Sequence, residues 1–349
     1  MYNKFVTLNN IKYIDKVVIK IKQIEKFSTH KVLAEEFKKY GIETKLMGRF
    51  LVADIDGEAV YFRETRPSTD SLIGSRFAKN KQMTKKLLKE KNISVAIGKV
   101  FDRNQQKEAL AYAQQLPSAV IKPLDGNKGT GVTTGITTEK EFLTAWDKCK
   151  KLSSGKILVE EQFLDGEEYR YLVIGGKFTA AHIRIPPTVV GNGVDTIEEL
   201  VEKKNNEKST NPYFAYKLIK LDKQRIASLE KRGHSLDDVL EKDKVLVIDS
   251  KGGLSTGGDS VDMTDKIHHS FKEIAEKAAR ALPGIDVVGV DILAKDHLKP
   301  ATKDNYIILE VNTQPGIGGH IHPSYGESRN VAKDIVEYVI KKIRLMKEL

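Results

Sequence analysis

The spacing of apolar residues along the chain predicts helices and strands in alternation. Short apolar runs at 119–124, 287–294 and 306–313 are typical of strands, whereas residues 139–152 and 270–282 repeat apolar side chains at helical spacing. Strands that alternate with helices in this way are typical of α/β or α+β proteins. We therefore expect that fold class here.

Two hairpins stand out in the pattern. The Asp56-Gly57 pair lies between strand-like runs within residues 48–62, and this dipeptide favours a two-residue turn. Residues 167–184 predict a second hairpin, made of the strand-like run EEYRYLVIGGKFTAAHIR. Neither hairpin carries an obvious catalytic group in its turn.

The segment 186–260 has the weakest periodicity of the chain. Its one clear signal is a capping box, in which Thr196 and Glu199 predict the start of a short helix. A chain of 349 residues corresponds to two or three domains at roughly 100–200 residues each.

Composition and charge narrow the function classes. The sequence is 40% hydrophobic and 30% charged, which excludes wholesale disorder. Its net charge of +10 is compatible with nucleic acid, with acidic substrates such as nucleotides, or with a merely solvated surface. The basic residues are spread along the chain without interleaved aromatic residues, so we expect no nucleic-acid partner.

The single cysteine, Cys149, cannot form a disulfide within one chain, which suits a reducing cytoplasm. It lies in a predicted helix and is expected to pack rather than react. The first ten residues lack the apolar core of a signal peptide, and no apolar run approaches the length of a membrane span. We expect a cytoplasmic protein without a membrane partner.

Three oxygen-bearing side chains lie on two of the apolar strands. Residues two apart share one face of a strand, so Glu310 and Asn312 point the same way. If the two strands pair in antiparallel fashion, Asp291 faces them. Two carboxylates and an amide oxygen are hard ligands that suit Mg²⁺, although polar residues on a solvent-facing strand would look similar. We favour the metal site.

A glycine-rich loop follows the strand that ends in Lys122. Gly126, Lys128, Gly129 and Gly131 belong to the run GNKGTG, whose glycines allow backbone N–H groups to approach an anion. No Lys-Ser or Lys-Thr pair follows the last glycine, so the loop is not a P-loop. By itself it is a weak signal, and an ordinary glycine-rich turn explains it as well.

The run VEEQFLDGEEYR places carboxylates on both sides of a turn. Glu161 precedes the turn and Glu168 follows it. Carboxylates can accept hydrogen bonds from ribose hydroxyls, and the backbone at a strand end can bind adenine. Taken alone, the run is better explained by a surface hairpin.

Two arginines are candidates for binding phosphate or carboxylate groups. Arg170 and Arg184 both lie in strand-like runs, and Arg184 is flanked by apolar residues among which an unpaired charge would be costly.

In chain order these pieces resemble the ATP-grasp superfamily over residues 78–349. The stretches that carry the resemblance include EEQFLDGEEYRYLVIGGK, RIPPTVVGNGVDTIEELV, GLSTGGDSVDMTD and EVNTQPGIGGHIHPSYGESRNVA. They are most similar to the ATP-grasp parts of cyanophycin synthetases and of bifunctional glutamate–cysteine ligase/glutathione synthetases.

The resemblance implies an ATP-grasp fold, with an N-terminal α/β domain and two α+β subdomains that clamp ATP. The implied divisions are residues 1–77, a central subdomain at 78–155 with the phosphate loop, and a C-terminal subdomain at 156–349 with an insert near 186–260. The implied roles are phosphate binding by Lys81, Lys122, Gly126, Lys128, Gly129 and Gly131, adenine binding by Glu161 and Leu164, ribose binding by Glu168, and binding of Mg²⁺, with Mn²⁺ as an alternative ion, by Asp291, Glu310 and Asn312.

The implied reaction is an ADP-forming carboxylate–amine ligation through an acylphosphate, acting on amino acids or small peptides. D-alanine–D-alanine ligases of the superfamily carry an arginine two residues before the metal-binding aspartate, where this chain has Gly289. Arg184 or Arg170 is therefore our hypothesis for the group that stabilises the oxyanion.

The resemblance leaves the substrates open. Alternatives to ligation of free amino acids are a glutathione-synthetase-like reaction on a γ-glutamyl dipeptide and the modification of a peptide or protein terminus. An ATP-binding regulator is a further alternative of another class, although the retained metal ligands disfavour it. By analogy we expect a homodimer.

Overall fold

The computed structural model describes residues 25–125, 130–163, 166–249 and 253–348. The chain forms two compact units, each assembled from separate stretches of sequence. Unit 1 comprises Met1–Val32, His182–Asp262 and Ile317–Val331, and unit 2 comprises Leu33–Ala181, Met263–Gly316 and Ala332–Leu349. The division into three consecutive domains remains a prediction.

Unit 2 contains an antiparallel sheet of order β1-β2-β3-β4 near the N-terminus. Asp56 and Gly57 adopt φ angles of 53° and 85°, as the predicted two-residue turn requires, and join β2 to β3. The hairpin is thus confirmed. The elements of this part are α2 (Thr29–Lys39, of which the first four residues belong to unit 1), β1 (Thr44–Met47), β2 (Phe50–Ile55), β3 (Glu58–Arg63), β4 (Arg66–Pro67) and the last helix, α11 (Val331–Lys347, of which the first residue belongs to unit 1).

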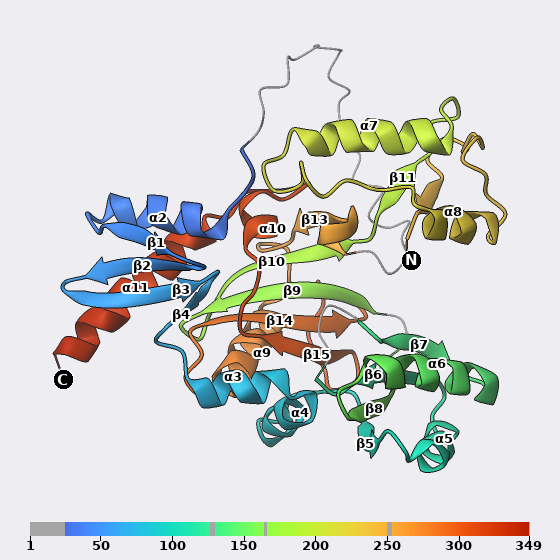
Figure 1. Ribbon diagram of the computed structural model, residues 1–349, viewed down its shortest axis with the longest axis horizontal. Coiled ribbons are helices and arrows are strands. Elements are labelled where there is room, and N and C mark those ends of the chain that lie inside the picture. Colours follow the sequence, from blue (N-terminus) through green and yellow to red (C-terminus); the bar gives the residue numbers. More distant parts are fainter. Residues whose placement is uncertain (1–24, 126–129, 164–165, 250–252, 349) are drawn as a thin grey trace. The chain divides into compact units, whose positions relative to one another are not determined.

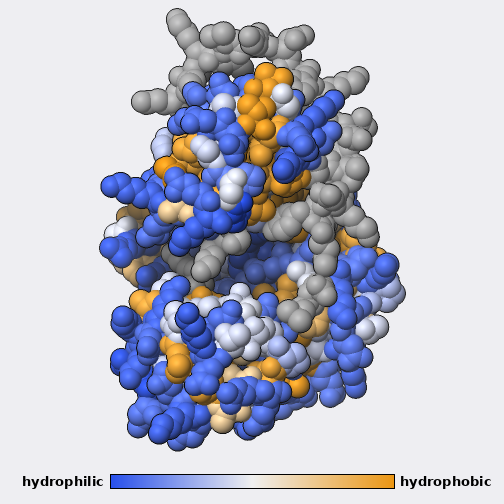
Figure 2. All heavy atoms as spheres, turned by 90° about the vertical axis from the view of Figure 1, so that its right-hand side faces the viewer, coloured by the Kyte–Doolittle hydropathy of each residue, from blue (hydrophilic) through white to orange (hydrophobic). Residues whose placement is uncertain are grey.

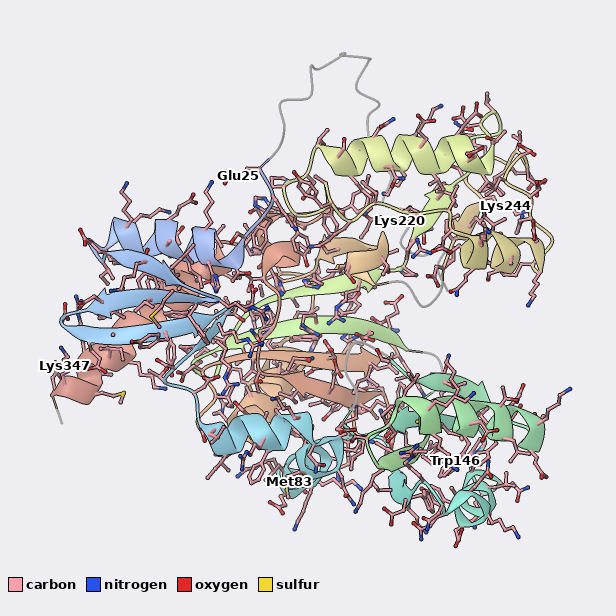
Figure 3. The ribbon with its side chains drawn as sticks, in the orientation of Figure 1. Glu25, Met83, Trp146, Lys220, Lys244 and Lys347 are labelled. Carbon is pink, nitrogen blue, oxygen red and sulfur yellow. The ribbon has the colours of Figure 1, made fainter. Side chains whose placement is uncertain are left out.

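A second antiparallel sheet in unit 2 has the order β5-β8-β6-β7. Helix α6 packs on one face of it, and Trp146 points from that helix toward the strands (Figure 3). Cys149 is buried in the same core, where burial raises the pKa of its thiol to about 11, so it packs as predicted. The elements are α3 (Leu72–Lys79), α4 (Lys81–Glu90), β5 (Gly98–Asp102), α5 (Gln106–Ala113), β6 (Ala119–Pro123), β7 (Thr133–Ile136), α6 (Glu139–Leu152) and β8 (Lys156–Glu161).

The remaining strands of unit 2 form the sheet that carries the acidic residues. Strand β14 lies between β9 and β15 and is antiparallel to both (Figure 1), which confirms the predicted pairing. The predicted hairpin of β9 and β10 is also present, and its two glycines adopt positive φ angles of 57° and 75°. The elements are β9 (Glu167–Ile174), β10 (Lys177–Ile185, of which the last four residues belong to unit 1), α9 (His269–Arg280), β14 (Val287–Ala294) and β15 (Tyr306–Asn312).

Unit 1 packs two helices around a small two-stranded sheet. Apolar residues of α7, α8, β11 and β12 share one hydrophobic core, and α7 begins at the predicted capping box of Thr196 and Glu199. Strand β13 pairs with the second half of β10. The elements are β11 (Thr188–Val190), α7 (Ile197–Ser209), α8 (Lys223–Glu230), β12 (Val245–Val247), a 3₁₀ turn η1 (Leu254–Thr256), β13 (Asp259–Asp262) and α10 (Gly318–Ile321).

Hydrophilic residues cover most of the face shown in Figure 2, in keeping with a sequence that is 30% charged. Within the described ranges, every helix is too short or too polar to span a lipid bilayer.

Two buried aspartates connect the start of β14 to the segment before α3 in unit 2. Asp286 accepts hydrogen bonds from Thr69, Tyr338 and Lys342, and its backbone N–H donates to Asp70 at 2.8 Å. The Asp70 side chain is only 1% exposed, and its nearest cation is Arg66 at 3.3 Å. Burial and then the nearby charge of Asp286 raise the pKa of Asp70 to about 6.

Replacement of Asp70 by Asn is expected to stabilise the protein at neutral pH. The folded-state pKa of Asp70 lies above its unfolded value, so its contribution to stability is complete below about pH 4 and is lost as the pH rises through 6. The gain in unfolding free energy of Asp70→Asn should therefore grow over this range, by on the order of 2 kcal/mol, and level off above pH 7. Urea denaturation of both proteins at several pH values measures this, and a difference that does not change with pH would contradict it.

Candidate functional site

The acidic residues of unit 2 come together through the register of three strands. Asp291 lies opposite Glu310 on β15 and opposite Arg170 on β9, so the three side chains share one face. Asn312 follows two residues after Glu310, and its amide lies 3.2 Å from Asp291 and 2.9 Å from Glu310. Period-two reasoning had predicted this grouping of the two acids and the amide.

Arg170 forms a buried ion pair with Asp291. Its Nε and Nη2 both donate to the carboxylate, and the two side chains are 11% and 2% exposed. Burial by itself would lower the pKa of Arg170, but the charge of Asp291 outweighs this and raises it. Such a pair fixes the orientation of the Asp291 carboxylate, since a planar guanidinium binds both oxygens.

Gly289 makes room for this arginine. A Cβ built on Gly289 would lie 3.1 Å from both Cδ and Nη1 of Arg170. A side chain at position 289 and the observed position of Arg170 would therefore compete for the same space. In this chain the guanidinium beside Asp291 comes from β9, whereas β14 has only a glycine two residues before that aspartate.

The donor set fits a hard divalent cation. Burial raises the pKa of Glu310, and the neighbouring carboxylate of Asp291 raises it further. Arg170 compensates the charge of Asp291, and a bound cation would compensate the charge of Glu310. Asn312 donates through its amide nitrogen here, and rotating the amide by 180° would present its oxygen instead. Among the described residues no three His, Cys, Asp or Glu side chains converge, so the site is two carboxylates and an amide.

Two of the predicted phosphate-binding lysines, Lys122 and Lys81, lie in unit 2 together with these acids. Lys122 is buried on β6 and is ion-paired with a glutamate of β8. Lys81 begins α4, and its Nζ donates to the carbonyl oxygens of Pro123 and Leu124 at 3.3 and 3.4 Å. Burial and then the charge of Lys122 lower the pKa of Lys81, whereas the carboxylate of Glu310 raises it. Lys81 is therefore the lysine that interacts electrostatically with an acid of the site, Glu310.

Sequence reasoning missed the residues that hold Lys122. Its partner is Glu160, the residue before the predicted Glu161, and Lys85 of α4 donates to the same carboxylate and to the Ala96 carbonyl oxygen. Burial lowers the pKa of Lys85 to about 8. Strand alternation was the available signal for this pair. Lys122 lies opposite Leu158 of β8, and Glu160 lies two residues after Leu158 on the same face of that strand.

Part of the predicted nucleotide site lies outside the described residues, namely Gly126, Lys128, Gly129 and Leu164. Gly131 is described and has a φ angle of 75°, a left-handed conformation that favours glycine.

The two predicted acids of the nucleotide site occupy the ends of neighbouring segments. Glu161 is the last residue of β8 and Glu168 the second residue of β9, and both are partly exposed. His297 is buried behind β9, where it stacks on Tyr169 and its Nε2 lies 2.8 Å from the Glu167 carbonyl oxygen. Burial lowers its pKa to about 4, so the ring is neutral at physiological pH and supports the strand that carries Glu168.

Arg184 belongs to the other unit. It lies on β10 opposite Ser260 of β13 and is partly exposed. Unit 1 also contains a buried pair of histidines that the sequence did not reveal: the Nδ1 atoms of His182 and His320 lie 3.3 Å apart.

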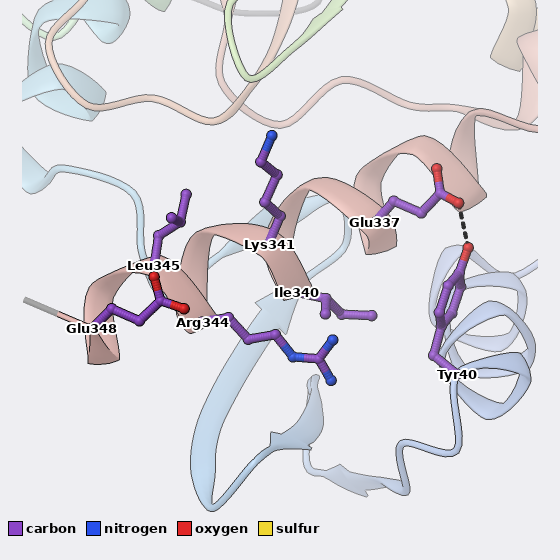
Figure 4. A pocket seen from close by; sticks show the side chains of 7 residues that line it. All are labelled: Tyr40, Glu337, Ile340, Lys341, Arg344, Leu345 and Glu348. Atoms are coloured by element: carbon purple, nitrogen blue, oxygen red, sulfur yellow. Dashed lines mark hydrogen bonds between the residues drawn. The ribbon is translucent and has the colours of Figure 1, made fainter.

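A shallow groove in unit 2 lies away from these candidate residues. It runs along α11 beside Tyr40, whose hydroxyl donates to Glu337 (Figure 4). Ile340, Lys341 and Arg344 also line it. None of the predicted site residues belongs to the groove, so we do not assign it a role in nucleotide binding.

The comparisons with known proteins agree with the architecture. The model of the ATP-grasp domain family matches residues 78–317. The chain is 35% identical over 276 residues to a cyanophycin synthetase of Synechocystis sp., a match that covers 78% of this chain and 31% of that protein. It is 33% identical over 339 residues to the glutathione biosynthesis bifunctional protein GshAB of Clostridium perfringens, covering 95% of this chain and 43% of that protein.

A solved structure is also similar to most of this chain. The chain resembles the bifunctional glutathione synthetase of Pasteurella multocida with a TM-score of 0.70 and 29% identity, over 90% of this chain and 44% of that one. The chain thus spans less than half the length of each of these relatives. On the family match over residues 78–317, the chain belongs to the ATP-grasp family.

Proposed function

We propose that the protein is an ATP-dependent carboxylate–amine ligase that joins amino acids or small peptides through an acylphosphate. A substrate carboxylate attacks the γ-phosphorus of ATP, and ADP leaves. An amine then attacks the acyl carbon, and phosphate leaves with formation of the amide. The observation that carries the proposal is the grouping of Asp291, Glu310 and Asn312 on one face of the sheet formed by β14 and β15.

The chain supplies position and charge for this chemistry. Lys81 and Lys122 would bind phosphate oxygens, while Asp291, Glu310 and Asn312 would hold Mg²⁺. The ion, when bound, neutralises charge on the phosphates. The predicted glycine loop at 126–131 would exclude water from the acylphosphate. The reaction needs no protein nucleophile, and the raised pKa of Cys149 fits that requirement.

We further propose that the enzyme works in the cytoplasm as a homodimer, as expected from the sequence. The division into residues 1–77, 78–155 and 156–349 is likewise kept as a proposal for its domain organisation.

A glutathione-synthetase-like reaction is the second candidate. The GshAB proteins are similar to this chain over 79–95% of its length and the cyanophycin synthetases over 78–87%, and the solved structure that is similar over 90% of the chain is a bifunctional glutathione synthetase. In that case a γ-glutamyl dipeptide would provide the carboxylate and glycine the amine.

Release of ADP with Mg²⁺-ATP tests the proposal. The assay compares single amino acids, pairs of amino acids, and γ-glutamyl dipeptides with glycine, and mass spectrometry identifies products. Release that requires two substrates, with a product equal to their sum less one water, would support the ligase and name its substrates. ATP binding without release for any pair, including short peptides, would contradict ligation of amino acids and small peptides and favour a regulator.

Arg184→Ala is expected to retain ATP binding and to reduce turnover at least tenfold, because we propose that its guanidinium stabilises the developing oxyanion. Titration with a non-hydrolysable ATP analogue measures the first effect, and ADP release at saturating substrates measures the second. Arg232→Ala, on the surface of the same unit, is the control. Wild-type turnover in Arg184→Ala would exclude this role.

A further inference from the structure

Glu160 is a buried carboxylate on which two lysines converge. Its side chain is 4% exposed, and those of Lys122 and Lys85 are 10% and 12% exposed. The three residues come from three elements, β8, β6 and α4. A Cβ built on Gly98, opposite Glu160 on β5, would lie 2.6 Å from the Glu160 Cβ, so the absence of a side chain there lets β5 lie close to the Glu160 side chain.

The arrangement places the predicted phosphate-binding lysine in an ion pair within the protein. A phosphate oxygen that reaches the Lys122 ammonium competes with Glu160 for the same charge. If Lys122 moved toward a phosphate and no other cation contacted Glu160, the buried carboxylate of Glu160 would be an unpaired charge in a low-dielectric interior. This is strongly unfavourable. Lys85 provides that compensation, since its Nζ contacts Glu160 and is anchored by the Ala96 carbonyl oxygen at 3.1 Å.

We propose that Glu160 is an internal counter-ion of Lys122 that the ATP phosphates displace, and that Lys85 is the positioning residue that keeps Glu160 neutralised during this exchange. The inference rests on the proposed function, because it requires ATP to bind at Lys122. It assigns Lys85 and Glu160 to the control of nucleotide affinity, without contact between Lys85 and the substrate.

The proposal predicts opposite effects for the two partners. In Lys85→Met, Glu160 has only Lys122 as a cation, so the exchange becomes costly and ATP binds at least tenfold more weakly. In Glu160→Gln, no carboxylate competes for Lys122, so ATP binds as tightly as in the wild type or more tightly. In the double variant, which combines Lys85→Met with Glu160→Gln, no carboxylate competes for Lys122. The affinity for ATP therefore returns to within threefold of wild type.

Isothermal titration with Mg²⁺ and the non-hydrolysable analogue AMP-PNP measures these affinities on the full chain. Lys86→Met is the matched control, because Lys86 is exposed on the same helix and should leave the affinity unchanged. In steady-state assays Lys85→Met should raise the KM for ATP at least tenfold and change kcat less than threefold. Lys85→Arg, which retains the charge, should bind AMP-PNP within threefold of wild type.

Two results would overturn the inference. The first is a Glu160→Gln variant that binds AMP-PNP more than threefold more weakly than the wild type does. This test remains valid even if Lys85→Met does not fold. The second is a double variant whose affinity for AMP-PNP is no higher than that of Lys85→Met. Failure of the proposed function looks different. A wild-type chain that binds AMP-PNP but releases no ADP with any substrate pair would contradict the ligase and leave the effects at Lys85 and Glu160 measurable, whereas a wild-type chain that binds no AMP-PNP would contradict both proposals.

Discussion

Glu310→Gln is expected to reduce ADP release by on the order of 10²–10³-fold while leaving the protein folded. The change keeps the size of the side chain but removes one of the two carboxylates that face each other across β14 and β15. Mg²⁺ held by Glu310 and Asp291 would contribute several kcal/mol to stabilising charge in the transition state, and losing that contribution corresponds to this loss of rate. Because burial and Asp291 already disfavour the charged form of Glu310, the variant should unfold at no lower urea concentration than wild type.

The measurement is ADP release at saturating substrates over a range of Mg²⁺ concentrations. Asp304→Asn is the control, since Asp304 is an exposed acid in the loop before β15. Turnover of Glu310→Gln within threefold of wild type would exclude Glu310 as a metal ligand.

Arg170→Met is expected to lower the unfolding free energy by about 3–5 kcal/mol, because it leaves the Asp291 carboxylate buried without its partner. Mg²⁺ should restore part of this loss, and should stabilise the variant more than the wild type, since the ion would take over the compensation of Asp291.

Urea denaturation with and without Mg²⁺ checks both effects. Arg280→Met is a suitable comparison, because its ion pair with Glu276 is exposed and should be worth less than about 1 kcal/mol. If Arg170→Met were as stable as Arg280→Met, the buried pair would not hold this part of the sheet together. If Mg²⁺ stabilised neither the wild type nor Arg170→Met, the proposed metal site would be wrong.

Local patterns determined much of what could be predicted. The turn at Asp56-Gly57, the capping box before α7 and the strands that carry Asp291 and Glu310 all depend on neighbouring residues, so the sequence was sufficient to predict them. The grouping of Glu310 with Asn312 followed from strand alternation, and the antiparallel pairing of β14 with β15 was expected from the polar loop that joins them.

The sequence by itself therefore determined the elements with a clear periodicity, the family resemblance and the grouping of two acids with an amide. The tertiary structure decided which charges compensate one another. Glu160 rather than Glu161 binds Lys122 and Lys85, and Arg170 rather than a residue at position 289 faces Asp291. These pairs join residues 38 to 121 positions apart. The physical basis of these pairs is burial. Two opposite charges can be buried together in a low-dielectric interior only where strand register and helix packing bring them into contact. A single sequence does not reveal that register or that packing.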